Sequence, residues 1–118
     1  MNPSTVALIQ EFVAAVPPFE EEYENHVSNF AEVLPTVFME DVRQSAVASF
    51  LGAADEPDWR GILAFLEEQF ALGDKDVQNV IFMSFIYPLP LPHEPGSGMV
   101  DHLGPTMAES FRSLRDAQ

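Results

Sequence analysis

Apolar residues recur at three- and four-residue steps along most of the chain, which is the spacing that gathers them on one face of an α-helix. The first such stripe consists of Leu8, Ile9, Phe12, Val13 and Val16. We predict a helix that is capped by Asn2, begins at Pro3 and ends before the Pro17-Pro18 pair, because proline suits the first turn of a helix and interrupts its interior.

A second helix is predicted directly after this pair, and Pro35 closes it. Its apolar positions are Phe19, Tyr23, Val27, Phe30 and Leu34. The glutamates between them fall mostly on the outer face, and they are Glu20, Glu21, Glu22, Glu24 and Glu32. The pattern therefore indicates an amphipathic helix whose exposed side is acidic.

Two more helices follow, each bounded by residues that favour helix ends. Thr36 suits the start of the third and Gly52 its stop, while Asp55 or Asp58 suits the start of the fourth and Gly73 its stop. The inward positions are Met39, Val42, Ala46, Val47 and Phe50 in the third helix, and Trp59, Ile62, Leu63, Leu66 and Phe70 in the fourth.

The segment 80–87 is apolar on all sides, so periodicity alone does not separate a buried helix from a buried strand. We predict a helix, because Asp74 begins a run of about a dozen residues after Gly73 and no second strand is available for pairing. Such a helix needs cover from neighbours on every side.

Prolines at alternate positions make the segment 88–98 unsuitable for a helix or a central strand. We expect a rigid loop that crosses to a last helix over about 105–115, in which Met107, Phe111 and Leu114 face inward. The length of 118 residues and a hydrophobic content of 47% suit one core. The prediction is an all-α single domain over residues 1–118 with about six helices, arranged as a compact bundle or as a short helical-repeat-like array.

Charge adds information about partners. The formal net charge is -14, and residues 1–42 contain eight carboxylates but no Lys or Arg. A field of this sign attracts basic surfaces and repels nucleic acid and anionic lipid. We therefore expect a basic protein partner, and neither nucleic acid nor a membrane. The amino-terminal segment lacks the basic start of a signal peptide, so we expect a cytoplasmic protein.

No set of residues suggests catalysis or metal binding. The chain has no cysteine, and its three histidines, His26, His93 and His102, are not grouped with a nucleophile. His93-Glu94 and Asp101-His102 flank a Gly-containing turn, but their spacing matches no zinc motif, so solvated or capping roles are favoured. We expect His26 to pair with a neighbouring carboxylate. The prediction is a protein that is not an enzyme and binds no cofactor or metal.

Three short motifs carry a resemblance. They are the Leu-Pro-x-x-Phe-Met-x-Asp-Val segment at 34–42, the Phe-Leu-Glu-Glu segment at 65–68 and the Val-Gln-Asn segment at 77–79. With them the chain resembles a family of small, acidic, all-helical bacterial proteins of uncharacterised function. This resemblance implies a helical fold, and the character of the family is similar to that of immunity proteins that neutralise bacterial toxins.

We therefore predict an immunity protein that occludes a basic toxin, such as a nuclease, through carboxylates that occupy its phosphate subsites. The partner-binding residues would be Glu20, Glu21, Glu24, Glu40, Asp41, Asp55, Glu56 and Asp58. Trp59 is expected to pack under the preceding turn. The alternatives are a helical-repeat interaction scaffold and a nucleic-acid mimic that inhibits a DNA-binding protein. Either a monomer or a homodimer is compatible with the sequence.

Overall fold

The computed structural model describes residues 3–53 and 58–116, with side chains up to residue 114. Its helices are α1 (Pro3–Ala15), η1 (Pro17–Phe19), α2 (Glu20–Phe30), α3 (Pro35–Phe50), α4 (Trp59–Ala71), α5 (Lys75–Ile81), the π-helical turn η2 (Phe82–Ile86), η3 (Ser97–His102) and α6 (Pro105–Asp116). The predicted all-α fold is confirmed, since no strand occurs in the described ranges. The roles predicted for Asn2, Asp55 and Glu56 lie outside them.

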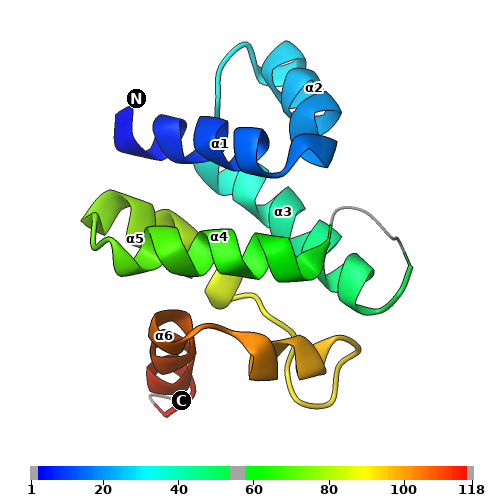
Figure 1. The fold of residues 1–118 in the computed structure, drawn as a ribbon, viewed down its shortest axis with the longest axis vertical. Helices are drawn as coiled ribbons and strands as arrows, with labels where there is room; N and C mark the ends of the chain where they lie inside the picture. The colour runs from blue at the N-terminus through cyan, green and yellow to red at the C-terminus, as the bar shows by residue number, and fades with distance from the viewer. Residues whose placement is uncertain (1–2, 54–57, 117–118) are drawn as a thin grey trace.

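Helix α4 crosses the middle of the molecule, between α1 on one side and α6 on the other (Figure 1). Helix α3 packs against η2, α4, α1 and α5, so it joins the two halves of the core. Helix α2 lies at one end, beside α1, where it leaves much of its surface to solvent (Figure 1). Within the described residues, no helix has the length and apolar composition needed to cross a bilayer.

Phe12 of α1 holds the amino-terminal helices on the core. Its ring meets Phe19, Phe38 and Phe65 edge-on, with centroids 5.0, 6.5 and 5.4 Å away. Edge-on aromatic pairs contribute about 0.5–1.5 kcal/mol each beyond the burial of their area. These contacts connect η1, α3 and α4 through one buried side chain, and they fix where α2 begins.

The predicted boundary between the second and third helices is wrong. Helix α2 ends at Phe30, because Ala31 takes a left-handed conformation with φ of 60° and its amide bonds to the Val27 carbonyl. Leu34 is therefore not in the second helix but precedes α3, which begins at Pro35 without a side-chain cap from Thr36. Proline explains this start, since its fixed φ suits the first helical turn.

The predicted starts and stops of the other helices are largely confirmed. Gly52 and Gly73 have φ of 81° and 87°, the left-handed region that favours glycine after a helix. Asp58 accepts a hydrogen bond from the Arg60 amide at 3.0 Å and begins α4. Asp74 accepts bonds from the amides of Asp76 and Val77 and begins α5.

The apolar run 80–87 is helical as predicted, but it is not covered on every side. Ile81, Phe85 and Ile86 are fully buried, whereas Met83 and Tyr87 are half exposed. The helix widens at η2, where the Tyr87 amide bonds to the Phe82 carbonyl five residues earlier. Consecutive residues 84–86 are all buried, and in the wider turn they span a narrower arc than they would in a regular α-helix.

The proline-rich segment crosses from η2 to α6, as expected, but Ser97 and Gly98 belong to η3 and not to a loop. Leu89 and Met99 are buried and anchor the crossing to the core. Gly98 lies where a Cβ atom would stand 3.2 Å from the Phe50 ring. A side chain at this position would therefore require the Phe50 ring to shift by a few tenths of an ångström.

Candidate functional site

Two glutamates of α2 line a hollow on the surface. Glu20 and Glu24 are one helical turn apart and lie on the same face of the helix. Together with residues of α1 and η1 they border a space of about 460 Å³. We call it the acidic hollow, and its lining residues are Gln10, Val13, Ala14, Pro17, Glu20, Tyr23 and Glu24. An apolar lining with two carboxylates suits a cationic side chain that has an aliphatic stem.

A second acidic contact joins α2 to α3. Partial burial and the negative charge of Asp41 together raise the pKa of Glu22 above its ordinary value. Asp41 is half-buried, and the next residue back along α3, Glu40, is exposed. A like charge at this position disfavours the charged state of the Glu22 carboxylate.

The remaining predicted partner-binding residues are distributed more widely. Glu21 is exposed on α2. Asp58 lies at the start of α4, does not line the acidic hollow, and forms an ion pair with Arg60 at 3.8 Å. The structure thus brings together two pairs of carboxylates, Glu20 with Glu24 and Asp41 with Glu22. Glu22 was not among the partner-binding residues predicted from the sequence.

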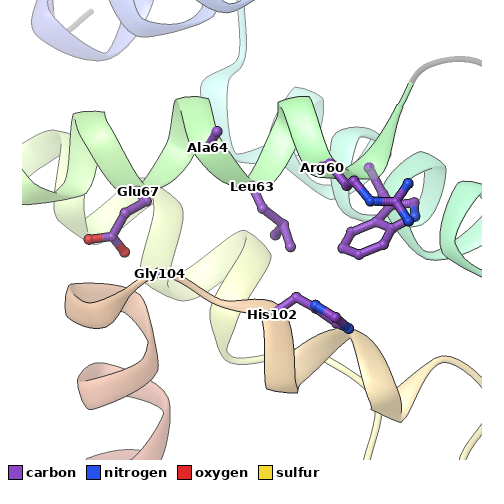
Figure 2. Close-up of a pocket in the computed structure, with 7 residues that line it drawn as sticks. Arg60, Leu63, Ala64, Glu67, His102 and Gly104 are labelled. Carbon is purple, nitrogen blue, oxygen red and sulfur yellow. The ribbon is translucent and has the colours of Figure 1, made fainter.

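A second hollow, of about 270 Å³, lies between α4 and the segment 102–104 (Figure 2). We call it the α4 hollow, and its lining residues are Trp59, Arg60, Leu63, Ala64, Glu67, His102 and Gly104. Trp59 is buried, as predicted, between Phe50 and His102, and both ring centroids lie 5.0 Å from its own. The Arg60 guanidinium carbon stands 4.4 Å from the centre of the indole ring.

Glu67 closes the other end of the α4 hollow by capping α6. Its carboxylate accepts hydrogen bonds from the Thr106 amide and hydroxyl and from the Met107 amide. Partial burial opposes ionisation, but the hydrogen bonds from the Thr106 hydroxyl and the two amides outweigh it and lower the pKa of Glu67. This role of Glu67 was not predicted from the sequence, since nothing local marks a contact between residues 39 positions apart.

A domain of unknown function, DUF7674, matches residues 9–117. The chain belongs to the DUF7674 family. This match agrees with the resemblance to a family of uncharacterised function. No curated protein and no solved structure matched the chain.

The three histidines of this DUF7674 chain have separate surroundings. His26 is buried, and the expected carboxylate partner is not found among the described residues; its Nε2 instead accepts a hydrogen bond from the Leu34 amide at 2.9 Å. His93 is exposed, and the ring of His102 meets that of Trp59 edge-on. Glu94 accepts a hydrogen bond from the Leu91 amide within the proline-rich segment. Within the described part of the chain, no three potential ligand side chains gather around a common point.

Proposed function

We propose that this DUF7674 protein is an immunity protein that binds a basic toxin through the carboxylates of α2 and α3. The observation that carries the proposal is the acidic hollow, where Glu20 and Glu24 border an apolar lining. Among the described residues, neither carboxylate forms an ion pair within 4.0 Å. Their negative charge is therefore free to meet a partner.

The interaction between Glu22 and Asp41 supports the same proposal. Partial burial and the negative charge of Asp41 raise the pKa of Glu22, so burial and repulsion from Asp41 disfavour the ionised Glu22 carboxylate in the free protein. A cation of the partner placed beside them would relieve this repulsion on binding. Free proteins gain no stability from such an arrangement, so a role in recognition accounts for it better than a role in folding.

Inhibition would result from occlusion. The negative surface speeds the encounter with a basic toxin, and the carboxylates occupy positions that phosphate groups would take in its active site. Lys or Arg of the toxin would enter the acidic hollow with its stem against Val13 and Tyr23. The apolar contact then lengthens the residence time of the complex, because affinity differences between related complexes arise mostly in the dissociation rate.

The experiment is a tagged pulldown from the source organism at low and high salt, with the bound proteins identified and the recovered partner then purified. The test variant is Glu20→Lys/Glu24→Lys. The matched control is Glu68→Lys/Glu109→Lys, which makes the same change in net charge at exposed positions of α4 and α6. We expect the wild type and the control to bind one basic protein at equal stoichiometry and to abolish its activity.

In the test variant we expect affinity to fall at least about 10-fold, because like charges placed together across an interface cost several kcal/mol. Equal binding by the test variant, or a recovered partner whose activity is unaffected, would contradict the proposal. Binding that instead depends on the exposed side chains Met83 and Tyr87 would favour an interaction scaffold.

A further inference from the structure

The α4 hollow combines the two features that a binding site for an organic carboxylate needs. One end presents nitrogen donors from Arg60 and His102, and the floor presents the apolar side chain of Leu63 (Figure 2). Cationic residues are scarce in this chain, which has five Lys and Arg against 19 Asp and Glu. A positive end in a hollow of such a protein is therefore distinctive.

Arg60 is held in position while most of its donors remain available. The Arg60 guanidinium lies over the indole ring of Trp59, and this cation–π contact favours the observed position of the side chain. A guanidinium group carries five N–H donors. Among the described residues Arg60 forms one ion pair, to Asp58 at 3.8 Å, which is longer than a hydrogen bond. The group thus has unused donors for a planar, two-oxygen acceptor.

His102 stands beside the same aromatic ring. Its imidazole is exposed and lies 5.0 Å from the Trp59 ring, centroid to centroid. Figure 2 shows His102 rising from η3 toward the end of the hollow that Arg60 occupies. Two nitrogen-bearing side chains from separate elements therefore face one end of the space.

Glu67 does not neutralise this end. It lies seven residues after Arg60 on α4, which corresponds to about 10.5 Å along a helix. Its carboxylate already accepts three hydrogen bonds from α6. Among the described residues, Arg60 pairs with the exposed Asp58 alone, so its end of the hollow presents a cation with unused donors, and Glu67 closes the other end.

We propose that the α4 hollow binds a carboxylate that carries a short apolar body, either a free organic acid or the chain-terminal carboxylate of a peptide. The carboxylate pairs with Arg60 and His102, and the apolar body covers Leu63. The volume of about 270 Å³ is below that of pockets for drug-sized ligands, which restricts the ligand to a small acid or one terminal residue. The ligand has the opposite charge to the partner of the acidic hollow, so this site is independent of the proposed function.

Trp59 makes the test direct, because it is the only tryptophan and lines the site. Its fluorescence and its indole N–H resonance are followed while butyrate is added at constant ionic strength, with butyramide as the uncharged control. We expect a saturable change with butyrate and none with butyramide. A parallel titration compares acetyl-Ala-Leu with its amide. Tighter binding of the free peptide than of butyrate identifies a peptide terminus as the ligand, and equal or weaker binding identifies a small acid.

Arg60→Gln is the test variant, and Lys75→Gln removes an exposed cation elsewhere as its control. We expect Arg60→Gln to weaken binding about 10-fold or more, since charge-assisted hydrogen bonds are the stronger class. Lys75→Gln should bind within about twofold of the wild type, because exposed distant charges are largely screened. No change in either signal with any carboxylate, an equal response to the amides, or unaltered binding by Arg60→Gln would overturn the proposal.

Discussion

Glu67 of α4 holds the first turn of α6 through Thr106. One carboxylate oxygen accepts the Thr106 amide at 3.0 Å and the Thr106 hydroxyl at 2.5 Å, although 39 positions separate the two residues. The side chain thus performs the task of a helix cap from a different helix. Because the carboxylate meets the amino-terminal end of α6, the helix dipole adds to the hydrogen bonds.

Replacing Glu67 by Gln should destabilise the protein by about 1–2 kcal/mol, since the charged acceptor of three hydrogen bonds is lost. Urea denaturation measures the difference. Glu68→Gln is the control, and because Glu68 is exposed it should change stability by less than about 0.5 kcal/mol. Equal effects of the two variants would show that the cap contributes nothing.

The same pair predicts a pH dependence. The pKa of Glu67 is lowered in the folded protein, so this group contributes stability above its unfolded pKa of about 4.3, and the contribution is lost as the pH falls through the folded value. The difference in stability between wild type and Glu67→Gln should therefore be constant near neutrality and shrink on acidification. Denaturation at several pH values checks this; a difference that grows on acidification would contradict the assignment.

Gly104→Ala and Gly61→Ala should act in opposite directions. A Cβ atom at Gly104 would stand 2.3 Å from Cγ of Glu67, so the substitution should displace the cap and destabilise by about 1–3 kcal/mol. Gly61 lies in α4 with no atom within 4 Å of the added Cβ, so alanine should stabilise by about 0.5–1 kcal/mol through its helix propensity. Thermal unfolding of both variants decides the signs. Unchanged or higher stability of Gly104→Ala would contradict the predicted clash with Glu67, and destabilisation by Gly61→Ala would contradict the prediction for α4.

Glu22→Gln should raise the free energy of unfolding at neutral pH by about a few tenths of a kcal/mol, which is the usual contribution of one exposed pair of charges. The pKa of Glu22 is raised in the folded protein by burial and by Asp41, so its ionisation opposes folding, and stability is lost as the pH rises through the folded value. The advantage of the variant should vanish in acid. Combining it with Asp41→Asn should give less than the sum of the two single effects, and full additivity would show that the two carboxylates do not interact.

His26→Phe should destabilise by about 1–3 kcal/mol, because the Leu34 amide loses its acceptor in a partly buried position. His26→Gln retains an acceptor and should recover part of the loss. His93→Gln, at an exposed site, should stay within about 0.5 kcal/mol of the wild type. Chemical denaturation compares the three, and an equal loss in the Phe and Gln variants would show that packing rather than the hydrogen bond explains the effect.

The sequence predicted those helix ends that local residues determine. Gly52, Gly73, Asp58 and Asp74 act through their own backbone or through amides two or three positions away. Ala31 could not be found in this way, because alanine is not typical of a left-handed stop. The hydrogen bond from the Leu34 amide to His26 closes this turn, and no local sequence pattern marks it.

Only part of the candidate site could be predicted from the sequence, because the rest depends on contacts between residues far apart in the chain. The four-residue spacing places Glu20 and Glu24 on one face, and this follows from helical geometry. The lining from α1 and the contact between Glu22 and Asp41 depend on how helices pack. The α4 hollow was also missed, since its walls at Arg60 and His102 come from elements 42 positions apart in sequence.

The π-helical turn η2 determines the direction in which the chain leaves the core. Removing one residue from Phe82–Ile86 would restore a regular helix and rotate everything after it by about 100°. Tyr87 and the proline-rich crossing would then point elsewhere, and Thr106 would no longer meet Glu67. This single π-helical turn thus sets the rotation of the last third of the chain relative to α4. We expect insertions or deletions in this turn to be tolerated less well than substitutions of its side chains.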